Sequence, residues 1–304
     1  MAKVETHVYG IYPKTENLRK NINRWERGKI ETGEIYEALR QEKEQYFTLL
    51  DENKIATFTD PLFNWYDVLR PIVLLSGGSL GPLTRYKENN TFYRLPEFEE
   101  VKGLTMDPTK NAEVESNPPF PLYQNAGSNG FSAFLPSPVT IYRMSQVSEK
   151  IGKSDFINKI TDNYLEICRK FGVKRTTIFE SFEYGNEDIS FLDRLSKELD
   201  VYLITEGKLN EATFKNLGEK LYSVVVSKEG DISLAAKYSK VPGVKLLDAH
   251  NTKLERVDSL KKKVEELSGG INAESIVVTN SDYYDFLPRS IADRKVEILS
   301  QVGE

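Results

Sequence analysis

From residue 175 onward the chain repeats one pattern, in which a short apolar run precedes a helical stretch about every 20–30 residues. The apolar runs are 175–181, 200–205, 221–227, 243–249 and 275–280. Strands that are apolar almost throughout are buried on both faces, which is typical of a parallel sheet covered by helices. This repeat therefore predicts an α/β protein with a parallel sheet.

Three further strand-like runs precede the repeat, at 5–11, 54–59 and 131–141. About eight strands with intervening helices favour a (β/α)8 TIM barrel, and we expect residues 1–304 to form it as a single domain. A doubly wound open sheet is the alternative, although no GxGxxG motif follows the first strand. Residues 103–130, rich in Pro, Asn, Gly and Ser, are predicted to form a long loop excursion above the barrel.

The predicted N-terminal helical extension begins soon after the first strand. Thr15 stands where a helix N-cap is expected. A second amphipathic stretch, at 31–53, places five apolar residues near one face. These residues are Ile35, Leu39, Tyr46, Leu49 and Leu50.

Composition excludes several classes of function. A net charge of −5 argues against a nucleic-acid partner. No apolar run reaches the roughly 18–20 residues of a membrane span, and the N-terminus lacks the pattern of a secretory signal. The sole cysteine, Cys168, fits a reducing cytoplasm. One cysteine and two histidines do not suffice for a thiolate-rich zinc site. A mixed site of histidine and carboxylate ligands remains the alternative, but no HxxxH or CxxC spacing indicates one, so we expect no bound metal.

In a (β/α)8 barrel the chemistry lies at the C-terminal ends of the strands. Polar residues recur at these positions, and carboxylates there could act as general acids or bases if two of them meet. Turns are polar in general, so an ordinary turn role remains the alternative for each one. The candidate carboxylates at these positions are Asp60, Glu180, Glu206, Asp248 and Asp282, and His250 follows a strand as well.

Basic residues gather near the start of the first predicted helix and in the segment 81–98. Lys14, Arg19 and Lys20 stand where free N–H groups and the helix dipole favour anions. The segment 81–98 is predicted to be a loop, and if it folds over the same mouth, Arg85, Lys87 and Arg94, which lie among aromatic residues, could join them, because an Arg fork binds carboxylate or phosphate. The alternative is ordinary solvated surface charge.

Several blocks, in this order, resemble the cobalamin-independent methionine synthases, and above all their N-terminal barrel and short archaeal relatives. The resemblance covers most of the chain. It is carried by "YGIYPKTENLRKNINRWERGKI", "TDPLFNWYDVLRPI", "LTRYKENNTFYRLPEF", "FLPSPVTIYRMS", "KLLDAHNTKLE" and "SIVVTNSDYYDFLPRSIADRK".

The resemblance implies a (β/α)8 barrel and methyl transfer to homocysteine. In the family's catalytic barrel, a His-x-Cys pair, a glutamate and a second cysteine hold the zinc that binds the thiol. This chain has no His-x-Cys, offers Ser223 to Ser227 on the corresponding strand, and has Tyr283 where the second cysteine is expected. The resemblance therefore implies a non-catalytic N-terminal-type barrel whose partner is a separate short zinc-dependent methionine synthase.

The family's N-terminal barrel contacts the polyglutamate tail of its folate donor through basic residues. By resemblance the tail-binding residues are Asn17, Leu18, Arg19, Lys20 and Arg85. The ligand implied is methyl-tetrahydrofolate or another methyl carrier. Two alternatives remain: a self-sufficient homocysteine methyltransferase or other enzyme that uses the strand-end carboxylates and His250, and a diverged barrel that binds another small anion.

Overall fold

The computed structural model describes residues 2–85, 92–110, 117–118, 120–182 and 189–304. Within these residues, eight parallel strands form one sheet in the order β2-β1-β11-β10-β9-β8-β7-β5. Their bounds are β1 Lys3–Val8, β2 Thr57–Phe58, β5 Ala133–Pro136, β7 Arg175–Glu180, β8 Asp200–Thr205, β9 Leu221–Val226, β10 Ser239–Leu247 and β11 Ser275–Asn280.

The two edges of this sheet meet and close it. Phe58 of β2 forms a parallel bridge with Phe131, just before β5. The Phe58 N–H donates to the Gly130 carbonyl at 3.0 Å, and the Phe58 carbonyl accepts from the Ser132 N–H at 2.8 Å. The strands follow one another around the barrel in chain order, which confirms the predicted (β/α)8 barrel. An open doubly wound sheet is excluded because the edges are joined.

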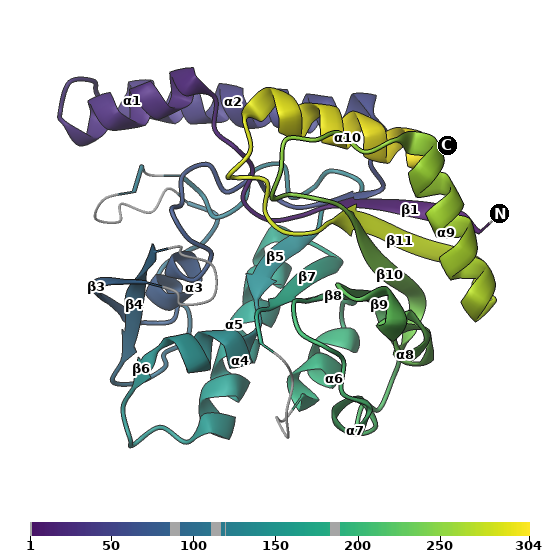
Figure 1. Cartoon of the computed structure of the whole chain (residues 1–304). Helices are drawn as coiled ribbons and strands as arrows, with labels where there is room; N and C mark the ends of the chain where they lie inside the picture. Colours follow the sequence, from purple (N-terminus) through teal and green to yellow (C-terminus); the bar gives the residue numbers. More distant parts are fainter. Residues whose placement is uncertain (1, 86–91, 111–116, 119, 183–188) are drawn as a thin grey trace.

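Helices surround the barrel (Figure 1). Their bounds are α1 Glu16–Glu26, α2 Thr32–Glu52, α3 Arg70–Leu75, α4 Pro138–Met144, α5 Lys153–Phe171, α6 Ser190–Ser196, α7 Glu211–Phe214, α8 Ile232–Tyr238, α9 Val257–Ile271 and α10 Arg289–Gly303. Helix α5 is long because its amphipathic pattern continues to Phe171, and Gly172 ends it in the left-handed conformation, at φ 64°. Among the described residues, no helix is long and apolar enough to cross a bilayer.

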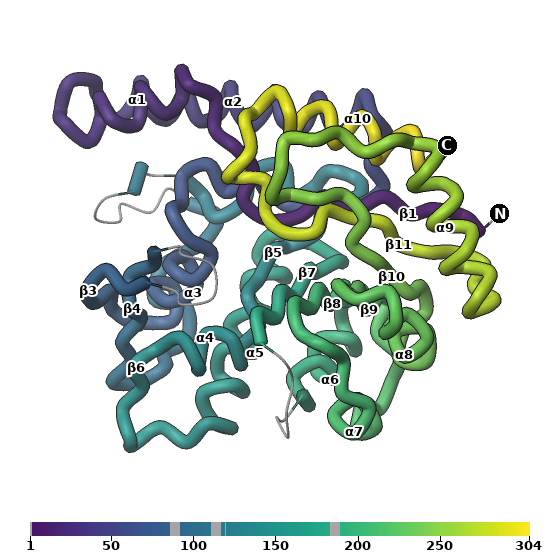
Figure 2. Tube along the Cα trace, in the orientation of Figure 1, coloured from purple at the N-terminus to yellow at the C-terminus, as the bar shows by residue number. Residues whose placement is uncertain are grey.

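The predicted N-terminal helical extension consists of α1 and α2, which follow β1. Thr15 caps α1 as expected, since its side chain accepts from the Leu18 N–H at 3.2 Å. Helix α2 buries four of the five predicted apolar residues and leaves Leu49 half-buried. In Figure 2 the start and end of the chain lie together, with β1 beside β11 and α10 near α2. The Ser300 hydroxyl of α10 donates to the Asn53 carbonyl at the end of α2.

β10 begins at Ser239, before the predicted run 243–249, and β1 ends at Val8, before the end of the predicted run 5–11. Two other segments form a different type of element from the one predicted. Residues 138–144 form α4 and not the end of a strand, because Ser137 caps a helix there and Pro138 suits its first turn. The segment 81–98 was treated as a loop, yet β3 (Ser79–Arg85) and β4 (Phe92–Phe98) form a hairpin that β6 (Gln146–Val147) extends. In the expected excursion, the described stretches 103–110 and 120–130 hold no helix or strand.

Candidate functional site

A cleft of about 550 Å³ opens at the C-terminal ends of the barrel strands. Four of the residues that line it come from different strand ends. Phe179 lies near the end of β7, Glu206 follows β8, His250 follows β10 and Asp282 follows β11. The β3–β4 hairpin supplies part of the opposite wall through Phe92. Barrel closure therefore brings together side chains that lie far apart in the sequence, at the end where such barrels carry their chemistry.

An ion pair between a buried lysine and a partly exposed glutamate lies at the surface of this cleft. The Lys245 ammonium, on β10, pairs with the Glu206 carboxylate, and the Lys245 side chain is 2% exposed. Burial lowers the pKa of Lys245 and raises the pKa of Glu206, while the attraction between the two groups opposes both shifts. The Lys245 ammonium also lies 5.9 Å from the centre of the Phe179 ring. Glu206 is one of the predicted strand-end carboxylates. Lys245 was not predicted as its partner, although a lysine within an apolar strand run was a signal for it.

Two further carboxylates lie on the loop after β11. The Asp282 carboxylate is 3.6 Å from Nε2 of His250. Burial, and then the neighbouring charge of Asp282, raise the pKa of Asp285 to about 6, although Lys14 opposes the shift. Of the predicted strand-end candidates, Glu206, His250 and Asp282 line the cleft. Asp248 instead organises the turn, where it accepts from the His250 N–H at 2.7 Å.

Aromatic rings form much of the remaining surface. Tyr283 lies against Phe179, with 5.0 Å between ring centres, and against Tyr9 at 6.2 Å. Gly10 leaves room for the Tyr283 ring, because a Cβ at Gly10 would overlap that ring. At the rim, the side chains of Tyr66 and Phe286 are largely exposed.

Asp60 and Glu180 are buried and hold structure together. Both oxygens of Asp60 accept from the Lys43 ammonium, at 2.9 and 3.0 Å, and the Lys43 and Asp60 side chains are both fully buried. Glu180 accepts from the Thr140 hydroxyl at 2.7 Å and from the Phe182 N–H at 3.0 Å. Neither carboxylate is among the residues that line the cleft.

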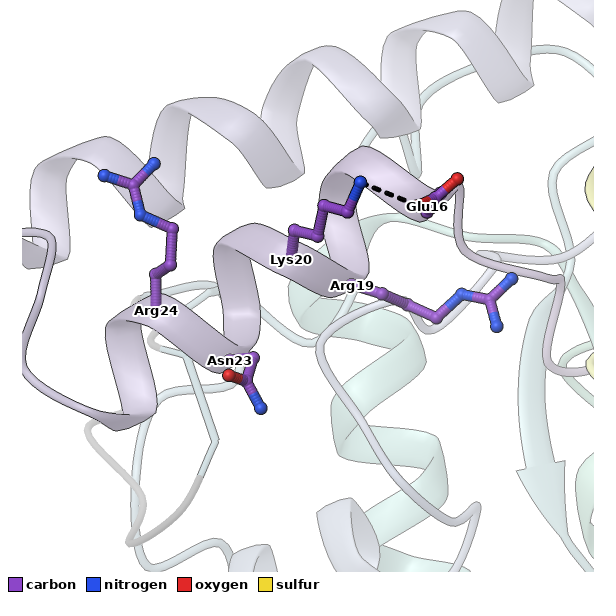
Figure 3. Close-up of a pocket in the computed structure, with 5 residues that line it drawn as sticks. All are labelled: Glu16, Arg19, Lys20, Asn23 and Arg24. Carbon is purple, nitrogen blue, oxygen red and sulfur yellow. Dashed lines mark ion pairs between the residues drawn. The ribbon is translucent and has the colours of Figure 1, made fainter.

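The predicted tail-binding residues Asn17, Arg19 and Lys20 are exposed on α1, which projects from the barrel on the side of β3 and β4 (Figure 1). A shallow hollow on α1 is lined by Glu16, Arg19, Lys20, Asn23 and Arg24. Figure 3 shows Lys20 paired with Glu16, at 2.6 Å, while Arg19 extends in a different direction from Lys20 and Arg24.

Lys14 lies between the cleft and the basic surface of α1, which consists of Arg19, Lys20 and Arg24. Its ammonium lies 3.5 Å from the Trp65 carbonyl oxygen and 5.9 Å from the centre of the Tyr66 ring. Burial lowers the pKa of Lys14 to about 8, the nearby charge of Arg19 acts in the same direction, and Asp285 opposes it. Lys14 thus lies within electrostatic reach of both α1 and the cleft.

The arginines of the hairpin lie beside the same opening. Arg85 is paired across the strands with Phe92, and Leu83 with Arg94. Directly paired residues point to one face of a sheet, so Arg85 shares its face with Phe92, which lines the cleft. The Arg94 guanidinium donates to the Gly81 carbonyl at 3.4 Å. Lys87, also considered from sequence, lies outside the described residues.

The family's zinc site does not fit the residues of this barrel. Cys168 is buried in α5, outside the strand ends, and burial raises the pKa of its thiol to about 12. Among the described residues, no group of three or more His, Cys, Asp or Glu side chains is placed to hold a metal ion. Thiolate coordination at the mouth therefore has no cysteine to supply it.

Solved structures share this fold, although no family model matches the sequence and no curated protein matches it. A B12-independent methionine synthase from Shewanella sp. W3-18-1, in complex with selenomethionine, is 12% identical, covers 99% of this chain and 97% of its own, and gives a TM-score of 0.70. A Listeria monocytogenes protein, provisionally assigned as a vitamin B12-independent methionine synthase, is 12% identical and covers 97% and 95%, with a TM-score of 0.64. A methyltransferase from Methanosarcina mazei is 12% identical and covers 98% and 92%, with a TM-score of 0.55. The resemblance predicted from sequence is thus confirmed at the level of the fold.

Proposed function

We propose that this protein is a methionine-synthase-type barrel that works as a binding subunit in methionine synthesis. Its partner is a separate short zinc-bearing homocysteine methyltransferase, and its ligand is an anionic methyl donor. One observation carries the proposal: the only cysteine, Cys168, is buried in α5, so this methionine-synthase-like barrel lacks a thiolate at its mouth. Activation of the homocysteine thiol is then the task of the other chain.

The fold supports the methionine-synthase-related part of this proposal. Two neighbours described as methionine synthases align with almost the whole of this chain and almost the whole of their own. Barrels of this size therefore occur among proteins described as methionine synthases. The same proposal places the protein in the cytoplasm, where a lone reduced cysteine is usual.

The donor tail is assigned to the basic surface that joins α1 to the hairpin. Arg19 and Lys20 are exposed on α1, Lys14 lies between α1 and the cleft, and Arg85 shares a face with Phe92. Guanidinium groups pair with carboxylates through two hydrogen bonds, which suits the repeated carboxylates of a polyglutamate tail. The donor is methyl-tetrahydrofolate with such a tail, or another anionic methyl carrier.

Mixing the protein with the zinc-bearing chain of the same cell tests the proposal. Sedimentation velocity measures the complex, and methionine formation from homocysteine and methyl-tetrahydrofolate triglutamate measures its effect. We expect a complex and a faster rate in the mixture than with the catalytic chain alone. A mixture that shows neither association nor a change in rate refutes the subunit role.

A double variant tests the anion site separately. Arg19→Ala with Arg85→Ala should weaken binding of the triglutamate donor by tenfold or more, measured by fluorescence titration. The matched control is Arg294→Ala with Lys262→Ala, which removes two exposed cations from α10 and α9. Equal affinity in the two double variants would favour the alternative of a diverged barrel that binds an unrelated small anion.

A self-sufficient enzyme is the second candidate, and the cleft gives it one specific observation. The Lys245–Glu206 pair and the His250–Asp282 contact lie together at the strand ends, where barrel enzymes carry out proton transfer. Metal analysis and a homocysteine methylation assay on the isolated chain distinguish the two candidates. Turnover without the partner, lost in His250→Ala, would support the enzyme and exclude the subunit role.

A further inference from the structure

The cleft is acidic, in contrast with the basic surface on α1. Four carboxylates line it, from Asp67, Glu206, Asp282 and Asp285, and none of its lining residues within the described chain is a lysine or an arginine. His250 lines it too, but an imidazole carries charge only when protonated. The mouth of the barrel is therefore unsuited to the anion that we assign to α1.

Two of these carboxylates have a strong cationic partner within the protein. Asp67 lies 3.4 Å from the Arg70 guanidinium, and Glu206 pairs with Lys245 from behind the cleft surface. Asp282 lies 3.6 Å from the imidazole of His250, and its charge also interacts with the Lys245 ammonium, but among the described residues no lysine or arginine forms an ion pair with it. The charge of Asp282 raises the pKa of Glu206 and that of Asp285, so Asp282 repels each of the other two carboxylates. A positive group placed among them would relieve that repulsion.

The aromatic surface beside these carboxylates fits the rest of such a ligand. Phe179 and Tyr283 lie next to Glu206 and Asp282 along the cleft, and Phe92 and Phe286 stand at its rim, 58% and 66% exposed. Aromatic faces attract cations as well as apolar groups. The volume of about 550 Å³ lies within the range of roughly 300–1,000 Å³ that is typical of small-molecule pockets.

We infer that this cleft binds a small primary amine with an apolar or aromatic body. The ammonium group lies between Glu206 and Asp282, and the body packs against Phe179, Tyr283 and the aromatic rim. Lys245 holds Glu206 in place from behind and leaves Asp282 to take the added charge. This site stands apart from the proposed function, because it neither needs the partner chain nor uses the basic surface of α1.

Two probes that differ mainly in charge test the site on the isolated full chain. Phenethylamine carries an ammonium and 3-phenylpropanoate carries a carboxylate on a similar aromatic body. Ligand-observed NMR with each probe up to 20 mM should show millimolar binding of phenethylamine. The carboxylate should bind at least tenfold more weakly. Equal binding of the two probes, or no binding of the amine at 20 mM, overturns the inference.

Variants then locate the binding. Asp282→Asn keeps the oxygen that accepts from the Tyr283 N–H, at 2.7 Å, and removes the charge, so we expect at least a fivefold loss of amine affinity. Phe286→Ala, at an exposed rim position, should lower the affinity for the amine by about twofold to fivefold. Asp51→Asn, an exposed site at the end of α2, is the matched control and should change nothing. Thermal unfolding checks that each variant is folded. Unchanged affinity in both cleft variants refutes the site.

Discussion

Replacing Lys43 by methionine tests how the charge pair beneath α2 supports the barrel. Lys43 and Asp60 are both fully buried, and the ammonium contacts both carboxylate oxygens. Asp60 also accepts from the N–H groups of Leu62 and Gln124, each at 2.9 Å. Methionine keeps most of the side-chain length against the Phe120 ring, so the main change is a buried carboxylate without its cation.

Removing one partner of a buried, hydrogen-bonded ion pair costs about 3–5 kcal/mol, because the remaining charge is left uncompensated. With an unfolding entropy of about 2.1 cal/mol/K per residue, that loss lowers the Tm of a chain of 304 residues by roughly 5–8 °C. Urea unfolding at 25 °C, followed by circular dichroism and checked for refolding, measures the free energy of unfolding directly.

Lys20→Met is the matched control, because it breaks an exposed pair with Glu16 on the neighbouring helix α1. Exposed ion pairs contribute little to stability, so this variant should have the same free energy of unfolding as the parent protein. A second variant, Lys43→Met with Asp60→Asn, also removes the uncompensated carboxylate charge and should recover part of the lost stability. If Lys43→Met is as stable as Lys20→Met, the buried pair does not stabilise the fold and our reasoning fails.

Three further predictions follow from the buried and capping groups. Because burial holds the pKa of Cys168 at about 12, iodoacetamide at pH 8 should modify the native thiol at least ~100-fold more slowly than the urea-unfolded one, and equal rates would contradict its burial. Asp285 has a folded pKa of about 6, above its unfolded value, so ionisation weakens the folded state as the pH rises from 4 to 7. The Tm of Asp285→Asn should accordingly rise relative to the parent over that interval, and a constant difference would count against the shift. Thr15→Ala removes the N-cap that accepts from the Leu18 N–H and should cost about 0.5–2 kcal/mol in urea unfolding, whereas Thr252→Ala, in an exposed loop, should cost nothing measurable.

Much of the barrel could be predicted from local pattern. Apolar strand runs and amphipathic helices alternate in the sequence, and the observed β7, β8, β9 and β11 lie within one residue of the predicted runs. Thr15 acts as the predicted cap because N-capping depends on residues three positions apart. The strand predicted at 131–141 is wrong beyond residue 136, because a helix begins there with Ser137 as its N-cap and Pro138 in its first turn.

The site was less accessible to sequence reasoning. Asp60 and Asp282 both follow a strand, yet Asp60 is buried against Lys43 and Asp282 lines the cleft. The aromatic hairpin around Phe92 was read as a loop, although it forms a wall of the same cleft. Side-chain alternation and strand-end polarity indicate which residues are polar, but not which neighbour each one meets.

The sequence by itself determined the order of strands and helices, the closed barrel that such an order favours, and the absence of a cysteine from the strand ends. Those properties depend on short-range periodicity and on residue identity. Only the tertiary structure decided that Lys245 pairs with Glu206, 39 residues earlier, and that Asp282 meets His250 beside an aromatic wall. Such contacts arise when the sheet closes and brings successive strand ends to one mouth, and the buried surroundings created there set which charges are neutralised and which remain for a ligand.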